Sequence, residues 1–241
     1  MIEVKGITKT FGDFKAVNEL SFSAQQGEVI GMLGENGAGK TTTLRMIATV
    51  LKPTKGEILV GGKNVVHNPE AVRKQIGILF GGETGLYDRL TARENIAYFG
   101  KLYGLDNALI KQRTESLANR FDMTRYLDKR VGGFSKGMKQ KTAIARSLVH
   151  DPSVVLFDEP TSGLDITSAN VIRQLIGEFK EEGRTVIFSS HIMSEVERLC
   201  DRVVIIHRGT LQYNGTLETL YQQNQTKDLD RIFMEMVGAG R

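Results

Sequence analysis

Residues 34–42 read GENGAGKTT and directly follow the apolar run VIGML. The segment from Gly34 to Thr41 fits the spacing G-x-x-x-x-G-K-[S/T], in which glycines let the backbone curl around an anion with its N–H groups pointing inward. The following residues, 41–49, have a helical pattern, so the positive end of the helix dipole adds to the same anion site. The stretch therefore predicts a phosphate-binding loop between a strand and a helix.

Two residues of this loop have specific expected roles. Lys40 is expected to reach the β- and γ-phosphates of a nucleotide, and the Thr41 hydroxyl to bind Mg²⁺. The residues expected to bind nucleotide here are Gly34, Glu35, Asn36, Gly37, Ala38, Gly39, Lys40, Thr41 and Thr42.

Size and composition favour a soluble globular chain. The 241 residues are 40% hydrophobic and 25% charged, which is enough for one substantial α/β domain with an inserted subdomain. The net charge of +4 is mixed along the chain, so no nucleic-acid partner is expected, while a basic surface near a membrane fits equally well. The single cysteine, Cys200, permits no internal disulfide and suggests a reducing cytoplasm. We expect Cys200 to be packed rather than reactive, and we expect neither a membrane span nor a signal peptide.

Strand-like and helical runs alternate over most of the chain, as in a doubly wound sheet. The expected strands are 2–4, 21–23, 29–33, 57–60, 76–80, 154–157, 185–188 and 203–206. The expected helices are 41–49, 92–103, 107–121, 138–150, 168–182 and 192–200. Strand signals vanish from about 84 to 150, which predicts an inserted helical subdomain. The tail after residue 222 is polar and then apolar, which suggests a linker and an amphipathic helix.

An apolar strand, VVLF, ends in the two acids Asp158 and Glu159. The carboxyl ends of strands in a nucleotide-binding sheet face the ligand, so Asp158 is expected to hold Mg²⁺ through water. Glu159 would then lie beside the γ-phosphate, where a carboxylate orients and partly deprotonates the attacking water. An apolar strand ending in Asp-Glu is weak evidence alone, and the phosphate loop is what favours the catalytic interpretation.

Three further segments have both an ordinary and a functional interpretation. Ser135 precedes a helical run, so it is either a simple helix cap or part of an anion site for a γ-phosphate held from the opposite side. The segment SGLD at 162–165 is by itself an ordinary turn. His191 follows the strand 185–188, and it is either a surface or core histidine or a contact to the γ-phosphate.

These motifs, in this order, resemble the ATPases of ATP-binding cassette (ABC) transporters. GENGAGKTT is similar to the Walker A loop, VVLFDEP to the Walker B strand with its catalytic glutamate, FSKGMKQ to the LSGGQ signature and SGLD to the D-loop. His191 matches the switch histidine, and Phe11 matches the aromatic residue that stacks on adenine. The resemblance covers residues 2 to about 215.

The resemblance implies an α/β fold with a P-loop nucleotide-binding core, made of a RecA-like sheet and an antiparallel β subdomain, and an inserted helical subdomain at about 84–150. Residues 1–222 would be the ATPase domain and 223–241 a short helical tail. It also implies Mg²⁺ and ATP as ligands, hydrolysis with Glu159, His191 and Lys40 as catalytic residues, and a head-to-tail homodimer across two ATP. The residues expected to contact ATP across that dimer are Ser135, Lys136, Gly137 and Asp165.

The signature departs from the family pattern at three positions. Phe134, Lys136 and Met138 stand where the family has Leu, Gly and Gln. Ser135 and Gly137 are kept, so the phosphate contact is expected to be kept as well.

A second departure concerns the glutamine of the Q-loop, which is expected after the strand 76–80 and is absent. Gly81 or Gly82 takes its place. In the family that glutamine helps to bind Mg²⁺ and links the site to the membrane partner, so Glu83, or a water held by the glycine backbone, is a candidate substitute.

The sequence around these motifs is similar to that of the NatA-type subgroup, and one such segment is GILFGGETGLYDRLTARENIAYFGKLYGL. These ATPases serve bacterial sodium export with a separate membrane permease of the ABC-2 class. The resemblance implies a place on the cytoplasmic face of the cell membrane, peripheral through the permease. Another transport substrate (a drug, lipid or polysaccharide) is the first alternative, a soluble ABC ATPase acting on ribosomes or DNA is the second, and a regulatory, non-hydrolysing subunit is the third.

Overall fold

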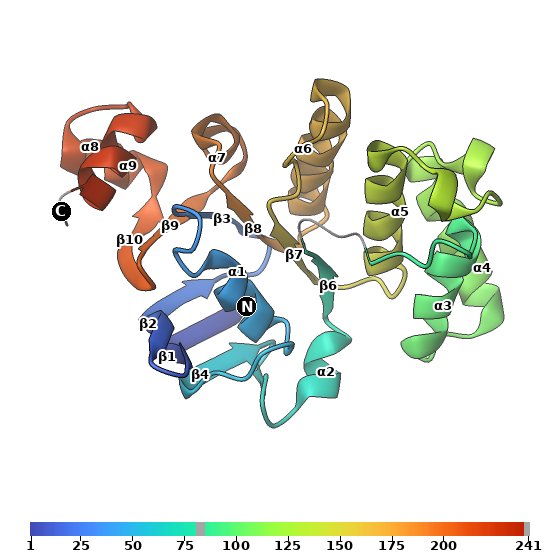
Figure 1. Cartoon of the computed structure of the whole chain (residues 1–241), viewed down its shortest axis with the longest axis horizontal. Helices are drawn as coiled ribbons and strands as arrows, with labels where there is room; N and C mark the ends of the chain where they lie inside the picture. Colours follow the sequence, from blue (N-terminus) through green and yellow to red (C-terminus); the bar gives the residue numbers. More distant parts are fainter. Residues whose placement is uncertain (81–84, 239–241) are drawn as a thin grey trace.

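The computed structural model describes residues 1–80 and 85–238, which form two sheets flanked by helices (Figure 1). The larger sheet has six strands in the order β10-β9-β3-β8-β7-β6, and all neighbours except β10 and β9 are parallel. Its strands are β3 (Val29–Leu33), β6 (Ile76–Leu79), β7 (Val154–Asp158), β8 (Thr185–Ser190), β9 (Arg202–His207) and β10 (Thr210–Thr216). The non-sequential order confirms the α/β class predicted from the alternating pattern.

The smaller sheet is antiparallel and has the strand order β2-β1-β4-β5. Its strands are β1 (Ile2–Phe11), β2 (Phe14–Ala24), β4 (Lys55–Val60) and β5 (Lys63–Asn64). Only short pieces of β1 and β2 were expected, because the outer halves of these strands carry exposed polar residues and lack a continuous apolar run. A hydrophobic cluster joins this sheet to one face of the larger sheet and to helix α1 (Lys40–Ile47).

The helical subdomain lies between β6 and β7 in the chain and on one side of the larger sheet (Figure 1). Its helices are α3 (Ala92–Leu102), α4 (Asn107–Arg120) and α5 (Lys136–Leu148). Each begins directly after a side-chain cap: Thr91, Asp106 and Ser135 accept from backbone N–H groups of the first turn. The cap explains why α5 begins two residues earlier than its apolar pattern suggested.

Four helices of the described C-terminal half share one hydrophobic cluster with the helical subdomain, on the face of the larger sheet opposite the smaller sheet. They are α6 (Ile166–Glu181), α7 (Met193–Leu199), α8 (Leu217–Asn224) and α9 (Leu229–Gly238), and a short helix α2 (Pro69–Arg73) precedes β6. The sequence did not reveal β5, β10, α2 or α8, and the expected boundary after residue 222 lies inside α8. The amphipathic α9 buries Leu229, Ile232 and Phe233 in the same core cluster as β3 and β8, so the tail packs onto the main core.

Across the described ranges, no helix combines the length and the apolar character that crossing a bilayer needs. Cys200 is packed, as expected: burial raises the pKa of its thiol well above the ordinary value, and a Cβ on Gly31 would come within 2.5 Å of its Sγ.

His150 joins the helical subdomain to the sheet. Its ring stacks on Tyr103, with the centroids 3.7 Å apart, and its Nε2 lies 3.1 Å from the carbonyl oxygen of Ile76. Burial lowers the pKa of His150 to about 4, since the charged form would lose its hydration. The folded chain therefore holds this histidine neutral.

We expect His150 to make stability pH-dependent. An unfolded histidine binds its proton at a pH of about 6.5, so the stability from neutral His150 is complete above that pH and is lost as the pH falls towards about 4. Replacing His150 with Phe keeps the stacked ring and removes the titration. Urea unfolding at pH 7 and 4.5 should show a loss on acidification that is smaller by about 2 kcal/mol in His150→Phe than in the wild type. His67→Gln, at an exposed position, is the control. Equal losses in all three proteins would contradict the assignment.

Candidate nucleotide-binding site

Two glycines of the loop between β3 and α1 are required by close backbone contacts. Gly39 has a φ of +107°, in the left-handed region, and a Cβ there would come 2.6 Å from the carbonyl oxygen of Ala16. A Cβ on Gly34 would come 2.5 Å from the carbonyl oxygen of Ile206. The loop is thus held between β2 of the smaller sheet and β9 of the larger sheet, which fixes its curvature.

Lys40 is the first residue of α1, and its side chain is only 5% exposed. Its ammonium donates to the carbonyl oxygens of Gly34 (2.7 Å) and Glu35 (3.1 Å). Burial lowers the pKa of Lys40, although nearby carboxylates oppose the shift. The cation is therefore held inside the curve of the loop, where phosphate oxygens would be stronger partners than neutral carbonyls.

Asp158 ends the buried strand β7 and faces the loop. It accepts hydrogen bonds from the Thr41 hydroxyl, at 2.8 and 3.0 Å, and from the Ser189 hydroxyl, at 2.7 Å. The parallel pairing of β7 with β8 places Asp158 directly opposite Ser189. The two residues expected to hold a metal are thus in direct contact.

Thr41 and Asp158 fit Mg²⁺, which prefers oxygen ligands and binds through one or two protein groups together with phosphates and water. Within residues 1–80 and 85–238 there is no cluster of three or more His, Cys, Asp or Glu side chains able to hold a metal by themselves.

Glu159 follows Asp158 and has a φ of +47°, a strained value for a residue that is not glycine. Its backbone N–H donates to the Ser189 hydroxyl at 2.9 Å. Its Oε1 lies 4.0 Å from the Lys40 ammonium and 3.5 Å from Nδ1 of His191. The fold thus brings three residues expected to be catalytic to one edge of the larger sheet.

The residues expected to act across a dimer form a separate cluster on α5, α6 and the loop before α6. Ser135 accepts from the N–H of Met138 at 3.3 Å, and Asp165 caps α6 by accepting from the N–H and hydroxyl of Ser168 at 2.9 and 2.8 Å. These bonds lower the pKa of Asp165. Lys136 donates to the carbonyl oxygen of Ser162 at 3.2 Å, in its own chain.

Gly137 completes this cluster, since a Cβ there would lie 2.8 Å from the Ser168 hydroxyl. In the part of the chain that the structure describes, no hydrogen bond or ion pair joins the cluster to residues 34–42. Within one chain, these contacts therefore leave the cluster and the phosphate loop unconnected.

Phe11 lies at the exposed end of β1, opposite Phe14, with the ammonium of Lys9 5.1 Å from its ring centroid. An exposed aromatic ring is suited to stacking. The expected Q-loop substitutes Gly82 and Glu83 lie outside the described residues.

Sequence reasoning missed several polar residues at this edge of the sheet. Ser189 joins Asp158 to the backbone of Glu159, and Gln140 donates to the carbonyl oxygen of Pro160 at 3.0 Å. Glu195, on α7, is a buried acid. For Ser189 a signal existed, because two serines end an otherwise apolar strand beside Asp158. No sequence signal marked Glu195 as a buried residue, since acidic residues are common on short helices.

Comparison with known proteins agrees with this geometry. The family model described as "ABC transporter" matches residues 17–162. The ABC transporter ATP-binding protein NatA of Bacillus subtilis is 54% identical over all of this chain and 99% of its own length. The bacitracin transport ATP-binding protein BcrA of Bacillus licheniformis is 39% identical over 93% of this chain and 72% of its own length.

Solved structures are similar over nearly the whole chain. The structure of an ATP-binding subunit of an ABC transporter has a TM-score of 0.90 and 31% identity, covering 98% of this chain and 99% of the other. A dimeric cassette in a post-hydrolysis state, bound to ADP and Pi, has a TM-score of 0.81 and 25% identity, covering 90% and 98%.

This chain belongs to the ABC transporter family as an ATP-binding subunit. It is an ATPase whose hydrolysis of ATP drives transport. Among its relatives, NatA of B. subtilis matches it from end to end.

The contact between Thr41 and Asp158 yields a testable expectation about the metal. Thr41→Val keeps the shape of the side chain and removes the hydroxyl, so the Mg²⁺ concentration for half-maximal ATPase activity should rise by about tenfold. Thr41→Ser keeps the hydroxyl and should stay near the wild type. A Mg²⁺ titration at saturating ATP measures both. An unchanged midpoint in Thr41→Val would remove Thr41 as a metal ligand.

Proposed function

We propose that this chain energises sodium export through a separate membrane permease of the ABC-2 class. The end-to-end similarity to NatA carries this proposal, together with the sequence texture of the NatA-type subgroup. The proposed location is the cytoplasmic face of the cell membrane, with the chain peripheral through the permease. The translocation path lies in the partner, so no residue of this chain is assigned to the ion.

Among the described residues, no hydrogen bond or ion pair joins the cluster around Ser135 to the phosphate loop, which supports a head-to-tail homodimer. Each ATP would lie between the phosphate loop of one protomer and Ser135, Lys136, Gly137 and Asp165 of the other, and a two-fold axis would supply both sites from one chain. The similar cassette bound to ADP and Pi is itself dimeric. ATP closes the pair, and hydrolysis releases it, because the γ-phosphate contacts exist only with ATP.

Within each proposed site, the side chains have separate roles. Lys40 would bind the β- and γ-phosphates, and Thr41 and Asp158 would hold Mg²⁺, which would supply charge neutralisation when bound. Glu159 orients the attacking water and accepts its proton. His191, 3.5 Å from Glu159, contacts the γ-phosphate and reports its loss.

Replacing Glu159 with Gln should separate binding from hydrolysis. ATP turnover should fall by about 10²–10⁴-fold, since the general base is lost, while an ATP-bound dimer accumulates. Size-exclusion chromatography with ATP measures the dimer, and phosphate release measures turnover. Glu181→Gln, at an exposed position of α6, is the matched control and should behave as the wild type. Hydrolysis at the normal rate in Glu159→Gln would exclude Glu159 as the base.

ATP-dependent uptake of radioactive sodium into inverted membrane vesicles tests the substrate. The chain is co-expressed with an ABC-2 class permease, and vesicles carrying Glu159→Gln are the control. Uptake that is lost in the control would support a sodium exporter. ATP hydrolysis without sodium uptake would contradict sodium export and leave the ATPase assignment intact.

Two alternatives to sodium export predict different results in membrane and nucleic-acid binding experiments. Another substrate, such as a drug, lipid or polysaccharide, is favoured by relatives such as the bacitracin transport protein and predicts membrane retention without sodium uptake. A soluble ABC ATPase acting on ribosomes or DNA predicts salt-sensitive retention of nucleic acid instead.

A further inference from the structure

Glu195 on α7 is the most buried carboxylate close to the site, with an exposed fraction of 2%. Its Oε2 accepts hydrogen bonds from the hydroxyls of Thr161, at 3.0 Å, and Ser190, at 3.1 Å. Its Oε1 accepts from Nε and Nη2 of Arg173, at 3.1 and 2.8 Å. Four donors and one opposite charge thus satisfy a buried carboxylate, which would otherwise be costly to desolvate.

The partners of Glu195 lie on the two segments that carry the proposed catalytic pair. Thr161 comes two residues after Glu159, and Ser190 comes directly before His191. The Ser190 hydroxyl also accepts from the N–H of Ile192 at 3.0 Å, so the turn containing His191 is tied from both sides. One carboxylate therefore fastens the backbone leaving β7 to the backbone leaving β8.

The network of Glu195 lies beside the contact between Glu159 and His191. Glu159 and His191 lie 3.5 Å apart, although His191 is half exposed and its segment is a short turn. An exposed contact between two polar side chains does not hold such a turn, since contacts of this kind contribute little in water. Bonds to a buried group are stronger, because water does not compete for them.

We propose that Glu195 is a positioning residue for ATP hydrolysis, which fixes the turn of His191 against the segment of Glu159 through Ser190 and Thr161. This inference rests on the proposed roles of Glu159 and His191. Glu195 itself contacts neither the loop at 34–42 nor Lys40 in any hydrogen bond or ion pair of the described residues. It acts through the two residues that it holds.

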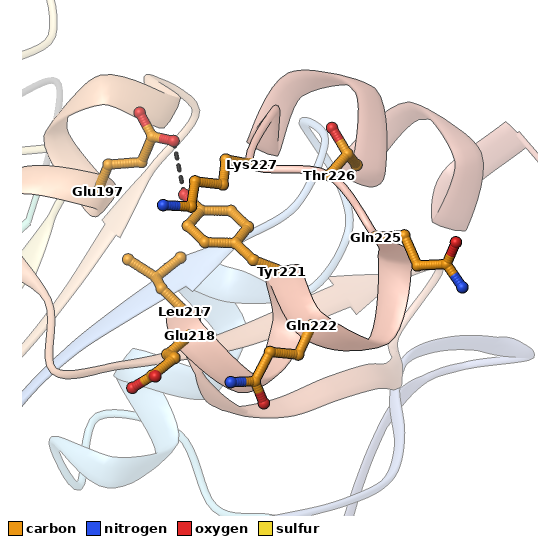
Figure 2. Close-up of a pocket in the computed structure, with 8 residues that line it drawn as sticks. All are labelled: Glu197, Leu217, Glu218, Tyr221, Gln222, Gln225, Thr226 and Lys227. Carbon is orange, nitrogen blue, oxygen red and sulfur yellow. Dashed lines mark hydrogen bonds between the residues drawn. The ribbon is translucent and has the colours of Figure 1, made fainter.

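The same helix offers a matched control. Glu197 lies two residues further along α7 and is exposed, and it accepts a hydrogen bond from the Tyr221 hydroxyl at 2.6 Å (Figure 2). This contact is at the rim of a groove between α7, α8 and the loop before α9, and the groove contains none of the motif residues. Glu197→Gln removes one carboxylate from α7 without touching the Glu195 network.

The test measures the kcat and KM of ATP hydrolysis for Glu195→Gln and Glu197→Gln, with and without His191→Ala. Glu195→Gln should lower kcat by about tenfold to a hundredfold with little change in KM, since a small misplacement of a reacting group has this effect. Glu197→Gln should match the wild type. In the His191→Ala background, Glu195→Gln should lose most of its effect, because the residue that it positions is already gone.

Two results would overturn the proposal. One is a wild-type kcat in folded Glu195→Gln. The other is the same fold-loss with and without His191, which would show a general structural role. If wild-type protein hydrolyses no ATP, the proposed function itself fails, which is a distinguishable outcome.

A milder pair of variants covers the case in which Glu195→Gln does not fold. Thr161→Val removes one donor without changing the shape of the side chain, and Thr161→Ser restores the hydroxyl. Thr161→Val should lower kcat by a few-fold at unchanged KM, and Thr161→Ser should recover it. Equal rates in both variants would overturn the proposal as well.

Discussion

The parallel pairing of β3, β8 and β7 is the constraint on which the site depends. Leu33 lies opposite Ser190, and Asp158 lies opposite Ser189. The carboxyl ends of β3, β7 and β8 therefore lie side by side, although the three strands are far apart in sequence. The phosphate loop follows β3, the acids Asp158 and Glu159 lie at the end of β7, and His191 follows β8. A shift of one residue in either pairing would turn every side chain of the shifted strand to the opposite face and separate these groups.

That register is held because the sheet is buried on both faces. One cluster joins its strands to the antiparallel sheet and α1, and another joins them to the helical subdomain and the C-terminal helices. The second cluster extends from α3 to α9, so the inserted subdomain and the tail share one core with β7 and β8. This shared core holds the strands rigidly where they carry the site residues. Polar contacts, such as those of Ser189, then orient the individual side chains.

Ser135, which matches the signature serine of the family, lies at the start of α5 and makes no hydrogen bond to the phosphate loop among the described residues. Ser135 caps α5 at the start of a helix that also reaches the segment after Glu159, since Gln140 and Lys136 donate to carbonyl oxygens there. In the proposed dimer, a contact made by Ser135 with one nucleotide would therefore bear on the backbone beside the other. Lys136, which stands where the family has glycine, adds a tether within its own chain.

Local sequence patterns predicted the phosphate loop, the acids that end β7, Ser135 as a candidate cap of α5 and the buried parallel strands, because each depends on a short motif or on glycine geometry. They did not predict that Asp165 caps α6. The sequence underestimated the lengths of β1 and β2. It also missed β5, β10, α2 and α8, because these elements are short or half-exposed and show no regular spacing of apolar residues. Three contacts became visible in the folded chain alone: Ser189 joins Asp158 to Glu159, α9 packs in the main core, and Glu195 binds Thr161 and Ser190. These contacts join residues whose meeting depends on strand order and packing, and no local pattern encodes that order.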